Sequence, residues 1–149
     1  MIILIAATDD KGGIGKNDTI PWRNKEDMKF FRDTTLWHPV VMGSVTYRSI
    51  VEVLGNPLPN RENIILSKFG SVSVQSIVQR ANNEKIYIIG GESIYRAFLP
   101  YADEIILTRI PGDYACDRFF PDIPPNWTSI KKAVGGLDVE YFRRKTTSD

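Results

Sequence analysis

Hydrophobic residues along the chain gather in short, nearly continuous runs, and stretches of mixed polarity separate these runs. Five runs are rich in β-branched residues and show little polar alternation: Ile2–Ala7, Val40–Met42, Asn63–Leu66, Lys85–Ile89 and Glu104–Thr108. Runs of this kind are typical of strands that are covered on both faces, as in a parallel sheet between two layers of helices. We therefore expect most of the sheet to be parallel.

The stretches between the runs carry helix signals. Asn24 is a suitable N-cap, acidic residues follow it in the first turn, and Met28, Phe31 and Thr35 recur at positions i, i+3 and i+7. Further helices are expected over the ranges Ser44–Leu54, Gln75–Ala81 and Glu92–Leu99.

The pattern changes beyond Pro111. The apolar segments Phe119–Phe120, Trp127–Lys132 and Val139–Arg144 are separated by proline-rich or Gly-Gly turns, which indicates antiparallel strands. No linker, repeat or low-complexity segment divides the chain. Residues 1–149 are thus expected to form one α/β domain, with a mostly parallel sheet and an antiparallel C-terminal end.

Composition narrows the classes of function. The chain has nineteen Lys and Arg and eighteen Asp and Glu, so its net charge is +1. A protein that binds the phosphates of nucleic acid usually has a larger basic excess, so this class is not favoured. The single cysteine, Cys116, and the single histidine, His38, exclude a disulfide framework and a zinc site built from several such ligands. The apolar opening Met1–Ala7 is too short for a signal peptide or a membrane span, so we expect a cytoplasmic protein.

The glycine-rich segment Gly12–Lys16 resembles a phosphate-binding loop, but its spacing argues against one. A P-loop needs a glycine five residues before Gly15, where Asp10 stands, and Ser or Thr after the lysine, where Asn17 stands. We interpret the segment as a flexible loop after the first strand, a position that often carries function.

Asp27 is a candidate for site chemistry because it lies four residues before Phe31, on the same face of the expected helix. If Phe31 points into the core, Asp27 points partly inward as well. A carboxylate among apolar groups needs a ligand or a hydrogen-bond donor as its partner. The pattern alone also allows an ordinary first-turn acid that the helix dipole favours.

Two strand–glycine–helix junctions are predicted, at Gly43 and at Gly90-Gly91. Glycine lets the backbone approach a ligand closely, and a helix N-terminus offers free N–H groups to an anion such as pyrophosphate. Two such junctions at the carboxyl ends of parallel strands indicate a nucleotide-binding crevice. In addition, Pro21-Trp22 could form a rigid wall, and Arg61 has a forked side chain that suits a carboxylate.

Taken together, these residues resemble dihydrofolate reductase, and the match extends along essentially the whole chain. The segments that carry it are Ile2–Ala7, Ile14-Gly15, Pro21-Trp22, Asp27 with Phe31-Arg32, Pro39–Gly43, Thr46-Tyr47, Pro57–Ser67, Ile89–Gly91, Thr108 and Phe120–Asp122. The resemblance implies a central eight-stranded sheet flanked by four helices. It also implies NADPH-dependent reduction of 7,8-dihydrofolate to 5,6,7,8-tetrahydrofolate, a step of one-carbon metabolism that supports thymidylate synthesis. We expect a monomer that binds dihydrofolate and antifolates, without nucleic acid, membrane or metal.

The resemblance also assigns residues to the substrate. It implies that Asp27 binds the 2-amino group and ring N3 of the pteridine, that Thr108 contacts the same amino group, and that Trp22 is part of the catalytic set. Arg61 would clamp the α-carboxylate of the glutamate tail. The ring and benzoyl pocket would be lined by Ile5, Ala6, Ala7, Met28, Phe31, Ile50, Leu58, Ile89 and Tyr95.

The cofactor residues follow in the same way. The set implied for the nicotinamide half and pyrophosphate is Ala7, Ile14, Gly15, Asn17, Thr19, Gly43, Ser44, Val45, Thr46, Ile89, Gly90, Gly91, Glu92, Ser93, Ile94 and Tyr95, with Ser67 and Lys68 beside the adenosine phosphate. The Gly90–Gly91 bond is characteristically cis in this family. Ser44 stands where the family commonly has a basic residue for the 2′-phosphate, so we expect Lys68 to take that role, with Arg48 as the second choice.

Two questions stay open at this point. N5 of dihydrofolate is expected to gain its proton from water admitted beside the loop around Ile14–Trp22, whereas direct donation by Asp27 would need a relay. The rival functions are the pterin-like pyrimidine reductase of riboflavin synthesis, which lacks the Trp22/Asp27 pair, and a binding protein without turnover. The full set of Asp27, Thr108 and Arg61 argues against the latter.

Overall fold

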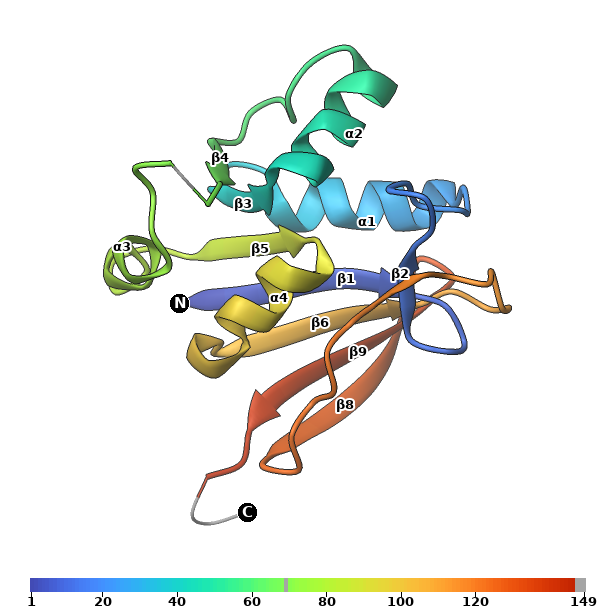
Figure 1. The fold of residues 1–149 in the computed structure, drawn as a ribbon. Coiled ribbons are helices and arrows are strands. Elements are labelled where there is room, and N and C mark those ends of the chain that lie inside the picture. Colours follow the sequence, from blue (N-terminus) through green and yellow to red (C-terminus); the bar gives the residue numbers. More distant parts are fainter. Residues whose placement is uncertain (69, 147–149) are drawn as a thin grey trace.

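A seven-stranded sheet forms the centre of the protein. The structure is a computed structural model that describes residues 1–68 and 70–146. The strand order is β4-β3-β5-β1-β6-β9-β8 (Figure 1). The bounds are β1 Ile2–Thr8, β3 Val40–Gly43, β4 Asn63–Leu66, β5 Ile86–Gly90, β6 Glu104–Arg109, β8 Trp127–Val134 and β9 Leu137–Arg144. The strands from β4 to β6 are parallel, whereas β9 runs antiparallel to β6 and to β8.

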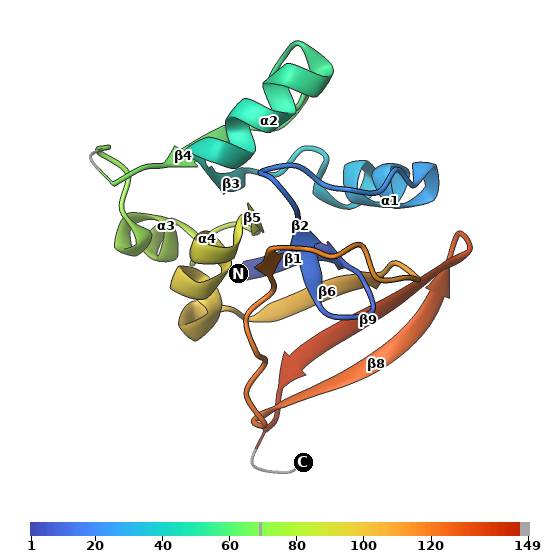
Figure 2. The same cartoon turned by 45° about the vertical axis from the view of Figure 1, so that its right-hand side comes forward.

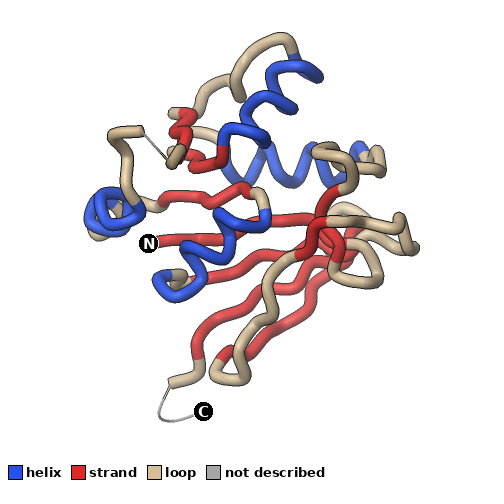
Figure 3. Tube along the Cα trace, viewed as in Figure 1, coloured by secondary structure: helices blue, strands red, loops and turns tan. Residues whose placement is uncertain are grey.

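Four α-helices flank this sheet, as expected. They are α1 Lys25–Thr35, α2 Ser44–Leu54, α3 Val74–Arg80 and α4 Glu92–Phe98, and the short 3₁₀ helix Leu99–Tyr101 continues α4 (Figures 1 and 3). One apolar cluster joins one face of the sheet to α1 and α2, through residues such as Phe31 and Ile50. A second cluster joins the opposite face to α3 and α4, through Ile77 and Phe98.

The number of strands in the main sheet differs from the sequence expectation of eight. The extra short strand β7, Arg118–Phe119, pairs with β2, Gly13–Gly15, in a separate two-stranded ribbon (Figure 2). The Phe120 N–H donates to the Gly12 carbonyl, and the Phe119 N–H donates to the Glu92 carboxylate, so β7 is bonded to the β2 segment and to α4. The predicted α/β class, with its antiparallel C-terminal end, is confirmed.

Local sequence signals explain where the helices begin and end. The Asn24 side chain accepts a hydrogen bond from the Asp27 backbone N–H at 2.9 Å and caps α1 as predicted. Gly55, with φ of 78°, ends α2. Helix α3 begins one residue earlier than predicted because Ser73 and Ser76 form a reciprocal capping box. No helix in the described ranges is long and apolar enough to cross a membrane.

Candidate active site

Asp27 and Thr108 meet at the carboxyl ends of the central strands. Asp27 lies in the first turn of α1, and Thr108 lies near the end of β6, directly opposite Ala7 of β1. Burial raises the pKa of the Asp27 carboxyl to about 6, although the hydrogen bond from the Thr108 hydroxyl lowers it. A half-buried carboxyl with a pKa close to neutrality can bind a cationic or N–H-rich ligand, or change its proton state, under ordinary conditions.

Tyr95 connects α4 to β1 next to this site. Its ring is buried on α4, and its hydroxyl donates to the Ile5 carbonyl at 2.7 Å. Burial, and then the negative charge of Asp27, raise the pKa of the Tyr95 hydroxyl, so it stays protonated and keeps its role as a donor. Tyr95 was expected to contact ligands, and the structure also gives it this structural bond between α4 and β1.

The two glycine junctions lie next to each other, because β3 and β5 are neighbouring strands in which Met42 pairs with Gly90. A Cβ at Gly43 would stand 3.2 Å from Ile94 Cγ1, and Gly90 has φ of 117°. The peptide bond between Gly90 and Gly91 is cis. A Cβ at Gly91 would meet only Thr46 Oγ1, at 3.8 Å. The backbone at Gly91 therefore borders open space next to Thr46, whereas Gly43 packs closely against Ile94.

The loop between β1 and α1 has a rigid tip. Lys16 and Thr19 exchange two backbone hydrogen bonds of 2.8 and 3.0 Å, and the residues between them, Asn17 and Asp18, both have positive φ. This is the tight two-residue turn that Asn and Asp tolerate well. Asn17 N–H also donates to the Asp117 carboxylate at 3.1 Å. The tip is exposed, so the candidates Asn17 and Thr19 lie at the surface.

Trp22 follows that tip and turns back into the protein. Its side chain is 8% exposed, and its ring packs edge-on against Tyr114 with the ring centroids 5.3 Å apart. The buried Nε1–H has no hydrogen-bond partner among the residues that the structure describes. A buried indole donor normally finds an acceptor. Trp22 therefore offers an unused donor at the entrance of α1.

Arg61 is held in place by its neighbours rather than by a carboxylate. Its Nε donates to the Pro59 carbonyl at 2.9 Å, and its Nη1 donates to the hydroxyl of the buried Thr35 at 3.1 Å. Asn63 fixes the same loop through the Arg61 carbonyl. Burial, and then the positive charge of Arg32, lower the pKa of the Arg61 guanidinium. Such a fork, positioned by neutral oxygens beside a second cation, suits an incoming carboxylate.

Most of the expected pocket residues share the apolar cluster on the α1 face. Within it, Ile5, Leu58 and Ile89 are buried, and Phe31 and Ile50 are partly buried. Met28 lies outside this cluster and is 58% exposed. The reason is geometric: Phe30 and Phe31 occupy the inner side of α1, which leaves Met28 at its edge.

Other predicted cofactor residues are spread along the surface. Ser67 and Lys68 are exposed just after β4, and Ser44, Val45 and Ser93 are exposed at the starts of α2 and α4. Arg48, the second choice for the 2′-phosphate, is exposed on α2. Ile14 and Gly15 are half-buried in β2, which pairs with β7 in the ribbon. The segment Gly12–Lys16 was expected to be a flexible loop, and the structure instead places Gly13–Gly15 in a short strand.

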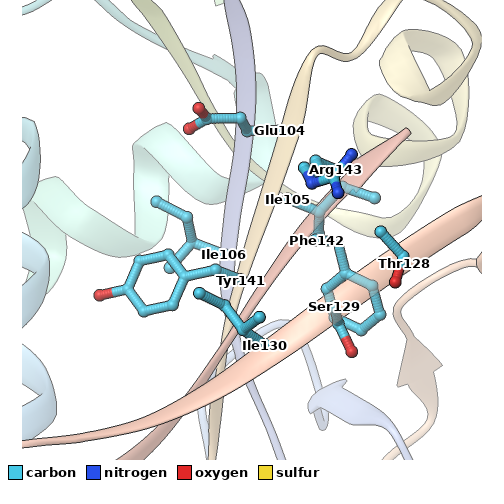
Figure 4. Close-up of a pocket in the computed structure, with 9 residues that line it drawn as sticks. All are labelled: Glu104, Ile105, Ile106, Thr128, Ser129, Ile130, Tyr141, Phe142 and Arg143. Atoms are coloured by element: carbon cyan, nitrogen blue, oxygen red, sulfur yellow. The ribbon is translucent and has the colours of Figure 1, made fainter. Parts of the chain in front are cut away.

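A separate hollow of about 230 Å³ contains none of the predicted site residues. It lies between β6, β9 and β8 and is lined by Glu104, Ile105, Ile106, Thr128, Ser129, Ile130, Tyr141, Phe142 and Arg143 (Figure 4). The side chains of Ile106, Tyr141 and Ile130 gather there. We find no group of three metal-binding side chains in residues 1–68 and 70–146.

Sequence reasoning missed residues that organise the loops around the site. Asp9, at the end of β1, and Tyr114, in the segment before β7, are joined by a hydrogen bond across 105 positions of the chain. The only signal was a pair of acids directly after a buried strand, Asp9-Asp10. Thr35, which contacts Arg61, was read only as part of the apolar face of α1.

This arrangement is that of an α/β enzyme. A titratable carboxyl and two glycine junctions lie at the carboxyl ends of neighbouring parallel strands, which is where such sheets bind nucleotides. Comparison with known proteins gives the particular family. The sequence profile of dihydrofolate reductase matches residues 1–147.

Individual relatives agree with the profile. The chain is 37% identical to the dihydrofolate reductase of Staphylococcus haemolyticus over 148 residues, which covers 92% of this chain and 87% of that protein. It is 34% identical to that of Bacillus subtilis strain 168 over 149 residues, covering 93% and 86%. Among solved structures, a dihydrofolate reductase from Enterococcus faecalis complexed with NADP(H) and RAB-propyl superposes with a TM-score of 0.82 at 29% identity, covering 98% of this chain and 97% of that one.

The chain belongs to the dihydrofolate reductase family. Its activity is the NADPH-dependent reduction of 7,8-dihydrofolate to 5,6,7,8-tetrahydrofolate. The resemblance found in the sequence is thereby confirmed, together with the enzyme class and the cofactor.

Proposed function

We propose that the pterin ring of dihydrofolate binds between Asp27 and the apolar cluster on the α1 face. The observation that carries this proposal is the half-buried Asp27 carboxyl, which is bonded to Thr108 and has no cationic partner among the described residues, so that burial raises its pKa to about 6. The 2-amino group and N3–H of a pterin are neighbouring donors that would satisfy both carboxylate oxygens. Thr108 holds the carboxylate and offers its own oxygen to the same amino group. The apolar lining of the ring would come from Ile5, Phe31, Ile50, Leu58 and Ile89, with Met28 at the rim. Ala6 and Ala7 of β1 would border the ring, although the Ala6 side chain packs in the cluster on the opposite face of the sheet.

Arg61 is proposed to bind the α-carboxylate at the far end of the substrate. Its contacts with Pro59 and Thr35 fix the plane of the guanidinium, and Arg32 adds a second positive charge nearby. A carboxylate bound there would form charge-assisted bonds without first displacing an internal salt bridge.

The glycine junctions fit a dinucleotide, because the backbone at Gly91 borders open space next to Thr46 and lies beside the start of a second helix at Gly43. When bound, NADPH supplies the hydride that the pterin receives. On this proposal Thr46 and the backbone of residues 90–95 hold the phosphates, with Gly43, Ser44 and Val45 beside them. Ala7, Ile14 and Gly15 border the nicotinamide, and the loop tip with Asn17 and Thr19 covers it. Ser67 and Lys68 lie toward the adenosine end.

Trp22 and Asp27 are proposed to guide the proton that N5 of the substrate must gain. The unused Nε1–H of Trp22 can donate to a water at the cleft entrance. Ionised Asp27 favours the protonated, electron-poor form of the ring by charge attraction. The remaining walls are apolar and exclude bulk water, which strengthens both effects.

Further parts of the proposal concern partners. Antifolates would compete for the Asp27 site, since any ring with adjacent amino and protonated ring nitrogen presents the same donors. The chain is proposed to act as a monomer without nucleic acid, in keeping with its net charge of +1. Sedimentation of the purified protein tests whether it is a monomer.

A steady-state assay of NADPH oxidation with dihydrofolate tests the residue assignment through Asp27→Asn. Asp33→Asn is the matched control, because Asp33 lies on the same helix but is exposed and paired with Lys29 and Arg32. Asp27→Asn should lose most activity at pH 7, while Asp33→Asn keeps it. Equal activity of the two variants would contradict the placement of the pterin on Asp27.

A further inference from the structure

Asp9 uses all of its polar atoms to join two loops. One carboxylate oxygen, Oδ1, accepts the backbone N–H groups of Lys11 at 2.9 Å and of Gly13 at 2.8 Å. The other, Oδ2, accepts the N–H of Tyr114 at 3.1 Å and faces the Cys116 thiol at 3.5 Å. The Asp9 backbone adds bonds to Gly12 and Gly13. A single side chain therefore ties the loop after β1 to the segment before β7.

The Asp9 side chain is 3% exposed, and no cation pairs with it in the part of the chain that the structure describes. Burial acts to raise the pKa of its carboxyl, but the N–H groups of Tyr114, Gly13 and Lys11 outweigh burial and lower the pKa. The carboxylate is therefore ionised and depends on these backbone donors. An amide at this position would keep the shape but would turn a donor toward groups that are themselves donors.

The hydrogen bond to Tyr114 connects Asp9 to Trp22 through the Tyr114 ring. The Tyr114 ring packs edge-on against Trp22, with the centroids 5.3 Å apart and the planes at 61°. It also lies close to Gly112, where a Cβ would stand 3.4 Å from the ring. The Tyr114 ring therefore lies between Gly112 and the indole of Trp22, on a backbone that Asp9 holds.

We propose that Asp9 is a positioning residue for hydride transfer, which acts by fixing Tyr114 so that its ring holds Trp22 in the wall of the cleft. The inference rests on the proposed place of Trp22 beside the substrate. Small displacements of a wall that aligns two reactants are costly in rate, so a residue outside the cleft can act on the chemical step.

A double-mutant cycle tests the relay. Asp9→Asn alters the carboxylate, and Tyr114→Leu removes the ring while keeping the backbone N–H that Asp9 accepts. The rate of hydride transfer is measured in a single turnover, with NADPH and its 4-deuterated form. Each single variant should slow this rate about tenfold, and the double variant should be no slower than the slower single, because both changes break one relay. If the double variant instead slows hydride transfer by the product of the two single effects, about a hundredfold, the proposal is overturned.

A second measurement separates positioning from a general loss of structure. Binding of folate to the ligand-free protein, followed by fluorescence, should weaken in both single variants, whereas the dissociation constant of NADPH should change less than twofold. Asp103→Asn is the matched control, since Asp103 accepts the Ile2 N–H at the opposite end of β1. If Asp9→Asn lowers the unfolding temperature but leaves the hydride rate and folate binding of the folded protein unchanged, Asp9 is only structural and the proposal is wrong.

Trp22→Phe distinguishes this proposal from the proposed site itself. If that variant leaves both hydride transfer and folate binding unchanged, Trp22 lies outside the working cleft, and the site assignment fails together with the relay. If Trp22→Phe slows hydride transfer but Asp9→Asn and Tyr114→Leu do not, the site stands and the relay alone is overturned.

Discussion

The hydroxyl of Tyr95 donates to the carbonyl of Ile5 across 90 positions of the chain, and this bond joins α4 to the middle of β1. Both partners are buried, so neither can exchange the bond for water. The same tyrosine lies under Gly90, where a Cβ would come within 3.2 Å of its ring. One side chain thus connects the cofactor junction to the strand that carries the substrate pocket.

Replacing Tyr95 by Phe should destabilise the protein by about 1–3 kcal/mol, because the Ile5 carbonyl stays buried without its donor. Chemical denaturation measures the loss. Tyr101→Phe is the matched control: its hydroxyl also makes one hydrogen bond, which it accepts from Gln75, but at the exposed surface. The control should change stability by less than about 0.5 kcal/mol. A similar loss of stability in the two variants would show that the buried Tyr95 hydrogen bond contributes no more than an exposed one.

Asp27→Asn should raise stability above pH 6 while lowering activity. The folded-state pKa of about 6 lies above the ordinary value of 3.8, so folding favours the neutral carboxyl. The contribution of Asp27 to wild-type stability is therefore greatest below pH 4 and falls as the pH rises from 4 to 6, where the buried group must ionise. The asparagine variant lacks this loss. Its unfolding temperature should exceed that of the wild type at pH 8 and should approach it at pH 4; a constant difference across this range would contradict the assignment.

The loss of activity in the Asp27→Asn variant should depend on pH. The loss should be large at pH 7 and smaller in acid, where dihydrofolate can arrive already protonated. Steady-state rates between pH 5 and 8 measure this trend. A loss that is independent of pH would indicate that Asp27 serves only to shape the pocket.

Arg61→Lys should raise the KM for dihydrofolate about tenfold, equivalent to ~1.4 kcal/mol, and leave the KM for NADPH nearly unchanged. Lysine keeps the charge but loses the two-pronged geometry and the contact of Nη1 with Thr35. Arg32→Lys, on the neighbouring exposed position, provides the control and should have a smaller effect. If Arg61→Lys weakened both ligands equally, Arg61 would be structural.

Lys68→Glu should raise the KM for NADPH strongly and alter that for NADH little, because only the former carries the 2′-phosphate. The wild-type preference should also weaken with salt, and the variant should lose that dependence. Arg48→Glu is the parallel variant, since Arg48 is exposed on α2. If Arg48→Glu raises the KM for NADPH relative to that for NADH more than Lys68→Glu does, the 2′-phosphate contact belongs to Arg48.

Elements with strong local signals could be predicted from the sequence. The apolar runs gave the five parallel strands with small errors at their ends, and Asn24 marked the start of α1 correctly. Helical spacing placed Phe31 on the inner face, but it failed for Met28, because the neighbouring Phe30 takes part of that face instead. Which of several apolar residues on a helix is covered depends on the sheet beneath it, and spacing alone does not contain that information.

Features that depend on contacts between distant segments could not be predicted. Asp9 reads as one of two surface acids, and only the fold brings Tyr114 and Cys116 to it. The pairing of β7 with β2 rather than with the main sheet also depends on a glutamate of α4. Asp27 stood between these cases: its helix face was predictable from spacing, whereas its pairing with Thr108, 81 positions later, followed only from the family resemblance.

The tight turn at Asn17 and Asp18 has a consequence for the energetics of ligand binding. Ordering one backbone residue costs about 1–2 kcal/mol, and a loose loop would incur this cost each time it settled over a bound molecule. Here the paired bonds between Lys16 and Thr19, and the tie from Asn17 to Asp117, fix the tip when the chain folds. The conformational entropy of the tip is therefore lost once, during folding, and it is not subtracted from the affinity for either ligand.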